Sequence, residues 1–332
     1  MREPAVPAQF YFHERGSMQD SKAAVRAREQ RWAVPVGIAS IVAVVLLIAA
    51  RPLNVSGDGD ADFLREAHEH AGSVLLSGLM QVLAFLLLAL PLVFLFRAVQ
   101  ARSDRVRPQL IGLVVAAPLF LAASSGLSIG VTNEGADKFV AGDAEASLTP
   151  KEANDECADE RKDEGNDFLV DEYEPTKGES PLRACEDRKL EDDAASDAVT
   201  EASLAPPATG LGLAGALGFA VALLYSGLWA MRTGFLSRFW GSLAMVAGIA
   251  FLLGPLFLVT LVFFVYFGML AFGIVPGGRP PAWEAAEAVP WPTPGEKAAG
   301  ELEPEGGWGE NDLEADEVDE ETGERRKRKQ RE

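Results

Sequence analysis

Charged residues are missing from the long hydrophobic stretches of this 332-residue chain, which also contains only two cysteines and three histidines. Ionisable groups inside a bilayer mark ion and proton pathways. Their absence counts against a proton-coupled transporter, a voltage sensor and an intramembrane metalloprotease. The HExxH spacing of a zinc protease is absent as well. We therefore expect no bound cofactor and a protein that is not an enzyme.

Five uncharged runs carry most of the hydrophobic residues, which make up 48% of the chain. A helix rises about 1.5 Å per residue, so roughly 20 apolar residues cross about 30 Å of hydrocarbon. Each run approaches or exceeds that length, and the last is long enough for two crossings. The sequence predicts an all-α polytopic membrane protein with about six transmembrane helices. The runs are residues 32–50, 71–96, 108–133, 202–231 and 239–278.

The last run contains a helix breaker near its middle. As one helix its 40 residues would measure about 60 Å, which is twice the hydrocarbon thickness. The pair Gly254-Pro255 interrupts the helical hydrogen-bond ladder there. We predict two short spans, at about 239–254 and 256–275, joined by a tight turn. The alternative is one span followed by a re-entrant or interfacial segment.

The charged segments between these runs complete the domain organisation. The largest, residues 131–208, holds 23 acidic and 8 basic residues, and the tail is rich in Gly, Pro and Glu, so both compositions predict disorder. The predicted parts are a cytosolic N-terminal segment at 1–31, transmembrane helices one to three at 32–130, an acidic, largely disordered extracytoplasmic loop at 131–208, transmembrane helices four to six at 209–275, and a disordered cytosolic tail at 276–332.

Arginines in the short loops set the orientation. Cytosolic loops of membrane proteins carry an excess of Lys and Arg. With the N-terminus inside, only Arg51 and Arg65 among the short-loop arginines lie outside. We therefore predict a multi-pass protein of the cell membrane with both termini in the cytosol. The nine inside arginines are Arg26, Arg28, Arg31, Arg97, Arg102, Arg105, Arg107, Arg232 and Arg238.

Small residues line the predicted fourth span. Two rows of Gly and Ala occur there at intervals of four residues, and such rows let helix backbones approach closely in lipid. We expect close helix packing along them. The rows are Gly210, Ala214 and Gly218, and Gly212, Ala216 and Ala220.

A short acidic segment outside the membrane resembles part of a calcium loop. Asp58, Asp60 and Asp62, followed by Glu69, match the ligand positions of an EF-hand. Phe63 stands where that loop needs its turn-forming glycine. We predict no bound calcium, and instead an acidic turn that leads into a short helix.

Two of the three histidines lie at the end of this acidic segment. His68 and His70 stand at i and i+2, so they point to different sides of a helix and cannot share a metal ion there. A zinc or copper site would need a strand or a loop at this position. We predict solvated histidines at the membrane interface and no bound metal.

Cys157 and Cys185 both lie in the predicted extracytoplasmic loop, which faces an oxidising compartment. A disulfide between them would contribute about 3 kcal/mol by the loop-entropy relation. The alternative is two free thiols in a flexible segment.

The chain ends in a basic block at residues 325–329. In the cytosol it would attract anionic lipid at about 1 kcal/mol per cation near the surface, in competition with the acidic stretch at 310–324. We expect the partners of the chain to be the lipid bilayer and further copies of the chain or other membrane proteins. No nucleic acid is expected.

Three segments resemble known proteins. Residues 231–243, MRTGFLSRFWGSL, and residues 276–283, PGGRPPAW, resemble stretches of uncharacterised multi-pass membrane proteins of actinobacteria. Residues 290–292, Pro-Trp-Pro, are similar too. The resemblance implies a bacterial plasma membrane. It carries over no catalytic or binding residue.

Three hypotheses about function stay open. The first is a non-enzymatic integral membrane protein that acts as a scaffold, sensor or envelope component through its loop and tail. The alternative is a subunit of a transporter or channel with an uncharged pathway. The second alternative is a lipid-modifying membrane enzyme, for which only His68 and His70 lie at the interface.

Overall fold

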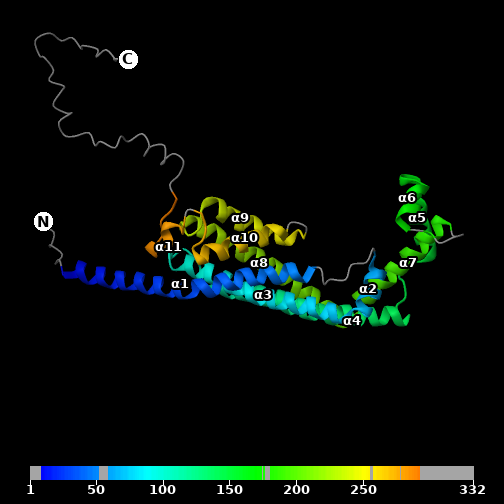
Figure 1. Ribbon diagram of the computed structural model, residues 1–332, viewed down its shortest axis with the longest axis horizontal. Coiled ribbons are helices and arrows are strands. Elements are labelled where there is room, and N and C mark those ends of the chain that lie inside the picture. The colour runs from blue at the N-terminus through cyan, green and yellow to red at the C-terminus, as the bar shows by residue number, and fades with distance from the viewer. Residues whose placement is uncertain are drawn as a thin grey trace, which may run out of the picture. The chain divides into compact units, whose positions relative to one another are not determined.

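The computed structural model describes residues 9–51, 59–173, 175, 180–254, 257–276 and 278–291, and every regular element within these ranges is helical (Figure 1). A 3-10 turn, Pro108–Leu110, precedes α4. The α-helices are α1 (Gln9–Ala50), α2 (Asp60–Glu69), α3 (Ala71–Gln100), α4 (Ile111–Ala141), α5 (Pro150–Glu164), α6 (Asn166–Tyr173), α7 (Pro181–Thr200), α8 (Ala205–Arg232), α9 (Arg238–Leu252), α10 (Phe257–Phe272) and α11 (Pro281–Ala285).

Four helices are long and apolar enough to cross a membrane. They are α1 from Lys22 onward, α3, α4 with its preceding turn, and α8. The helices α9 and α10 are also apolar but have only 15 and 16 residues, which corresponds to about 22–24 Å of rise. The all-helical class predicted from the uncharged runs is therefore confirmed for the described residues, and four helices have the length and composition that a membrane crossing needs.

The six apolar helices pack in a closed circuit that follows their order in the chain. Helix α3 packs between α1 and α4, α8 between α4 and α9, and α10 between α9 and α1. Phenylalanine rings fill the interior: Phe219 lies 4.8 Å from Phe251 and 6.0 Å from Phe264, between ring centroids. Such offset aromatic contacts add to the packing of a core. The bundle is thus filled by side chains where these rings meet.

Glycines allow α8 to approach α4 and α9 closely. A Cβ atom on Gly215 would stand 2.8 Å from the Leu121 amide nitrogen of α4, and one on Gly248 of α9 would stand 2.8 Å from the Ala220 carbonyl of α8. Gly218, in a predicted row, also faces α4, whereas Gly210 faces open space. The expected close packing is present: a Cβ atom on Gly212, in the other predicted row, would stand 2.8 Å from the Ser124 hydroxyl oxygen of α4, as close as the one on Gly215, which belongs to neither row.

The predicted interruption of the last hydrophobic run is also present. Helix α9 ends at Leu252 and α10 begins at Phe257, and Gly254 has a φ of +60°, a conformation that glycine adopts without a steric penalty. The Thr260 hydroxyl donates to the Ala247 carbonyl at 2.8 Å and ties the two helices together.

The acidic segment 131–208 differs from our expectation of a largely disordered loop. Helix α4 continues to Ala141, and α5, α6 and α7 follow. Local signals outweigh the net charge: Thr149 and Glu152 form a capping box at the start of α5, and the Ser180 hydroxyl caps α7. Each such cap contributes about 1 kcal/mol. Composition alone does not detect these positions.

The start of the C-terminal tail also differs from the predicted disorder. Helix α11 forms within residues 278–291, and Trp283 is buried against the bundle. Its indole provides apolar area that the Gly- and Pro-rich composition conceals. The terminal basic block at 325–329 lies outside the described residues.

Candidate functional site

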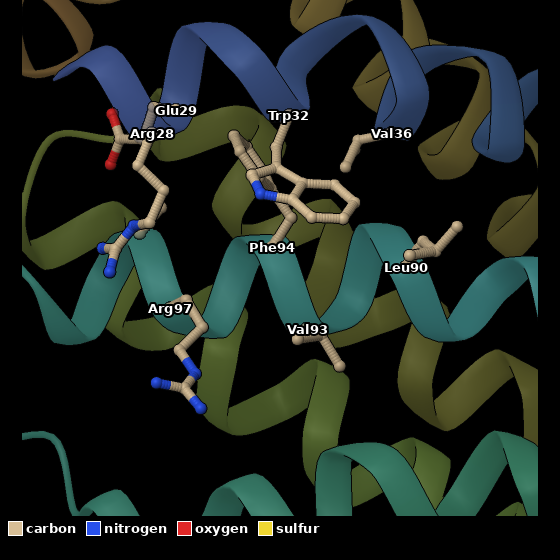
Figure 2. Close-up of a pocket in the computed structure, with 9 residues that line it drawn as sticks. Arg28, Glu29, Trp32, Val36, Leu90, Val93, Phe94 and Arg97 are labelled. Atoms are coloured by element: carbon tan, nitrogen blue, oxygen red, sulfur yellow. The ribbon is translucent and has the colours of Figure 1, made fainter. Parts of the chain in front are cut away.

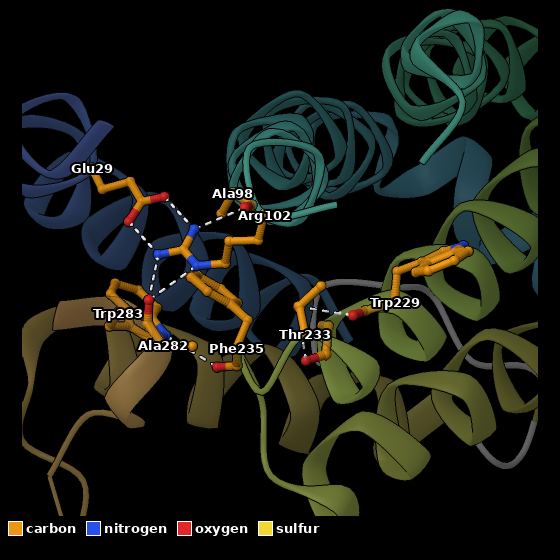
Figure 3. A network of polar contacts seen from close by, with 9 residues as sticks. Glu29, Ala98, Arg102, Trp229, Thr233, Phe235, Ala282 and Trp283 are labelled. Atoms are coloured by element: carbon orange, nitrogen blue, oxygen red, sulfur yellow. Dashed lines mark hydrogen bonds and ion pairs between the residues drawn. The ribbon is translucent and has the colours of Figure 1, made fainter. Parts of the chain in front are cut away.

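A charged pair is buried at the end of the bundle that holds the start of α1 and the end of α3. The Arg102 guanidinium donates to both carboxylate oxygens of Glu29, with Nη1–Oε1 at 2.5 Å and Nη2–Oε2 at 2.8 Å. The two side chains are 0% and 6% exposed. A buried bidentate arginine–carboxylate pair is strongly oriented. Figure 3 shows Glu29 of α1 facing Arg102 across this site.

The remaining donors of Arg102 bind backbone carbonyls. Nε and Nη2 donate to the Ala282 carbonyl at 3.0 and 2.8 Å, and Nη1 donates to the Ala98 carbonyl at 2.7 Å. The guanidinium also lies 4.8 Å from the ring centroid of Phe235, a cation–π contact. The buried charge is thereby paired and hydrogen-bonded, which a buried ion requires.

Trp283 of α11 packs beside the Arg102–Glu29 pair and binds Phe235. The Trp283 indole N–H donates to the Phe235 carbonyl at 3.1 Å, and the two rings stack with centroids 4.4 Å apart. We call Glu29, Arg102, Phe235, Ala282 and Trp283 the arginine clamp (Figure 3). The clamp joins α1, the end of α3, the α8–α9 connection and α11. Its chemistry is positioning, because none of its polar groups is left to react.

Sequence reasoning missed the clamp. Arg102 counts as one of nine inside arginines, and Glu29 stands in a mixed polar segment 73 positions away. The charge pattern therefore indicates which loops are cytosolic and does not indicate a buried ion pair. The one available hint is that Glu29 is an acidic residue among the arginines that precede the first span.

Beside the clamp, a pocket of about 210 Å³ opens between α1 and α3. Arg28 and Arg97 line one end, and Trp32, Val36 and Leu90 line the other (Figure 2). The pocket therefore combines two cations with an apolar wall, and no sequence motif marked it.

A second pocket, of about 300 Å³, lies between α3 and α4 and is lined by uncharged polar groups. Ser77, Gln81, Ser125, Ser128 and Thr132 contribute to it. The Gln81 amide donates to the Ser77 hydroxyl at 3.3 Å, and the Ser128 hydroxyl donates to a carbonyl of its own helix. The Ser77 hydroxyl in turn donates to the Ala50 carbonyl of α1 at 3.3 Å, whereas the Ser128 bond within its own helix is common for short polar side chains.

The acidic helices pack into one unit, which we call the outer subdomain. It consists of α2, residues 131–141 of α4, and α5, α6 and α7. Asp62 of α2 binds Arg188 of α7 and, at 3.0 Å, Arg65. Arg65 also reaches Glu191 at 2.8 Å. The Arg188 hydrogen bond, with the further contribution of Arg65, holds the pKa of Asp62 below its ordinary value of 3.8. Ion pairs thus connect α2 to α7.

Cys157 of α5 and Cys185 of α7 form a disulfide, with their Cα atoms 6.1 Å apart. Both are buried around Leu169 of α6. Nearby, burial and then a hydrogen bond to Glu160 raise the pKa of Tyr173 to about 12. The small core of the outer subdomain is therefore cross-linked.

The residues weighed for a metal site are not brought together within the described ranges. Asp60 and Asp62 lie on α2, a helix, whereas an EF-hand requires a loop there; Asp58 lies outside the described residues. The His68 ring bonds Asp137 at 3.0 Å, while the His70 ring bonds the Glu66 carbonyl.

One cluster among the described residues has the composition of a metal site: Cys157, Glu160 and Cys185. Zinc and other soft metals bind the thiolate form of cysteine. Because both sulfur atoms are joined in the disulfide, this cluster offers no thiolate and holds no metal in this state.

No family model, no curated protein and no solved structure matches this chain.

Proposed function

We propose that the protein is a non-enzymatic, six-span component of a bacterial plasma membrane that presents the outer subdomain as a scaffold or sensor surface. In this proposal α1, α3, α4, α8, α9 and α10 all cross the bilayer. Both termini are cytosolic, and the outer subdomain faces outward. The nine inside arginines support the orientation, and the closed circuit of six apolar helices supports the number of spans.

The observation that carries the proposal is the construction of the outer subdomain. It is a folded, disulfide-linked helical unit in which ion pairs join α2 to α7 and in which α7 packs on α4. A solvated linker needs none of these features, because it would bury little and would stay disordered. A unit continuous with a span is suited to hold a partner or to report its binding to the membrane bundle.

The exposed side of α5 suggests the chemistry of the partner. Asp155, Asp159 and Asp163 recur every four residues and are all exposed, so they lie in one row on the helix surface. Lys162 binds Asp159 at 2.6 Å, and the row presents the negative charge of Asp155 and Asp163 outward. It suits a cationic protein surface, which its field would attract.

Co-purification from native membranes tests the proposal. The triple variant Asp155→Asn, Asp159→Asn, Asp163→Asn should lose partners that the parent chain retains, and the parent complex should weaken with salt. The matched control removes three acids elsewhere on the same side: Asp143→Asn, Glu145→Gln, Glu172→Gln. Equal partner sets for the parent and the α5 variant would rule out the acidic row as the working surface.

A transporter or channel subunit with an uncharged pathway remains the second candidate, and the polar pocket between α3 and α4 favours it. Gln81 lines that pocket and also a neighbouring one of about 290 Å³ beside Arg51 and Phe257. If solutes pass there, Gln81→Leu should abolish solute flux in proteoliposomes, while Ser125→Ala reduces it. No flux in the parent chain would exclude this function.

A further inference from the structure

We propose that the pocket between α1 and α3 binds one anionic phospholipid of the cytosolic leaflet, with its phosphate between Arg28 and Arg97. The proposal rests on the orientation given above and does not depend on the role of the outer subdomain. It concerns the bundle itself and assigns a ligand to a pocket that the proposed function leaves unused.

The pocket has a basic end and an apolar end. Figure 2 shows the Arg28 and Arg97 guanidinium groups toward one side and Val36 and Leu90 toward the other. Along α1, Arg28 and Val36 are eight residues apart, and along α3, Arg97 and Leu90 are seven apart. These separations correspond to about 10–12 Å of helix rise. The distance matches a phosphate at the membrane surface and the first carbons of an acyl chain below it.

The charge of the pocket is not neutralised by the protein. Within the described residues, neither Arg28 nor Arg97 has an acidic partner at salt-bridge distance. The single carboxylate in the pocket wall, Glu29, already receives two hydrogen bonds from Arg102. Arg28 and Arg97 both line the pocket and are exposed, so the donors of their guanidinium groups stay available to an anion at its basic end. Arginine forks bind phosphate oxygens through charge-assisted hydrogen bonds.

The apolar end opens to the lipid-facing surface of the bundle. Trp32 is 46% and Leu90 is 37% exposed. On α3, the exposed side chains of Leu90 and Leu86 stand one turn apart and continue one helix face toward the bilayer centre. An acyl chain can follow them, whereas a soluble anion would use only the arginines and leave the apolar wall without a partner. A zwitterionic lipid would add an ammonium group beside two arginines, which like-charge repulsion disfavours.

Native mass spectrometry of the full chain in detergent tests the proposal. With phosphatidylglycerol, the parent should retain one lipid per chain, and phosphatidylcholine should bind at least tenfold more weakly. The double variant Arg28→Gln, Arg97→Gln should lose at least tenfold in affinity for phosphatidylglycerol. The matched control, Arg105→Gln with Arg107→Gln, removes two exposed arginines from the same side and should bind as the parent does. An equal loss in both double variants would mean diffuse attraction and would overturn the site.

Further measurements identify the molecule that occupies the pocket. Trp32→Ala should weaken lipid binding several-fold, and glycerol 3-phosphate at millimolar concentration should not displace the lipid. Displacement by it would show a site for free phosphate esters instead. Replacing the acidic residues at 310–324 by their amides in the full chain should leave lipid binding unchanged. A tenfold gain on that replacement would show that the tail of the chain itself occupies the pocket, and the lipid proposal would fail.

Discussion

Arg102 has no exposed side-chain area, yet it carries a full charge at the end of a membrane bundle. Its guanidinium is accommodated because every direction of donation meets an acceptor: Glu29 and the carbonyls of Ala98 and Ala282. Removing one partner of a buried pair leaves the other charge uncompensated, which is far more costly than the net contribution of the intact pair. The clamp therefore makes a sharp prediction at a single residue.

Arg102→Ala should destabilise the bundle by roughly 3–5 kcal/mol, since it strands the Glu29 carboxylate. Arg102→Lys should recover only part of the loss, because lysine lacks the planar fork that binds Glu29 and Ala282 together. Unfolding in detergent, followed by circular dichroism, measures both. The exposed Arg105→Ala is the control, and a loss in Arg102→Ala no larger than in Arg105→Ala would contradict the clamp.

Gly234 makes a second prediction at the residue scale. Its φ is +73°, and a Cβ atom there would stand 1.8 Å from the Val289 carbonyl oxygen. The Val289 amide donates to the Thr233 carbonyl at 3.0 Å, so the segment after α11 lies on this turn. Gly234→Ala should detach that segment and speed amide exchange at Val289 at least tenfold. Gly278→Ala is the matched control, because Gly278 shares the positive φ but faces open space.

The outer subdomain illustrates how short helices gain stability at the element scale. Isolated helices of this length are marginal in water. Here α5 and α7 are capped, joined by a disulfide across 28 positions of sequence, and tied to α2 by ion pairs. The disulfide limits the unfolded chain, the caps satisfy the helix ends, and the ion pairs hold α2 against α7.

Removing the disulfide should loosen α5 and α7 while leaving the membrane helices intact. For a loop of 28 residues, the entropy relation gives a loss of roughly 3–4 kcal/mol. The double variant Cys157→Ser, Cys185→Ser should therefore become sensitive to protease between 150 and 200. Unchanged cleavage kinetics there would show that the caps and ion pairs suffice.

Acid should weaken the contact between α2 and α7. The pKa of Asp62 is lowered, chiefly by Arg188, so its carboxylate stabilises the folded state at pH values above its ordinary pKa of 3.8. That stabilisation is lost as pH falls below 3.8 and through the lowered pKa. Because Asp62 is about one third exposed, the effect should be at most about 1 kcal/mol. The protection of α7 amides against hydrogen exchange, taken relative to the intrinsic exchange rate at each pH, should fall on acidification in the parent, and Asp62→Asn should show the lower protection at every pH.

At the scale of the whole molecule, the number of spans depends on whether α9 and α10 both cross the bilayer. Helices α9 and α10 have 15 and 16 residues, which is short for a full crossing. Two short spans and a re-entrant pair both return the chain to the side on which α8 ends. They differ in whether the α9–α10 turn reaches the far side.

Single cysteines resolve this in a background that lacks the two native ones. Leu253→Cys, at a position that is 54% exposed, should react with a membrane-impermeant maleimide from outside intact cells if α9 and α10 both cross. A cysteine in place of Arg105 should react only after lysis. A cytosolic reading at position 253 would contradict six spans, and an external reading at position 105 would contradict the orientation.

The sequence by itself determined the all-helical class, the long apolar segments of which four form helices of crossing length, and the break near Gly254. These follow from local patterns, because a charge-free run longer than the bilayer and a Gly-Pro pair act on the residues that contain them. The prediction of disorder in 131–208 failed because capping and cross-linking depend on a few positions, which composition averages away.

Only the tertiary structure decided the arginine clamp and the two-ended pocket. Glu29 and Arg102 are 73 residues apart, and each looks like a solvated charge until α1 and α3 pack side by side. Packing then removes water from one arginine and leaves Arg28 and Arg97 facing an apolar wall. The sequence states which residues are charged. Contacts between distant segments decide which of those charges is buried, which is paired and which stays available.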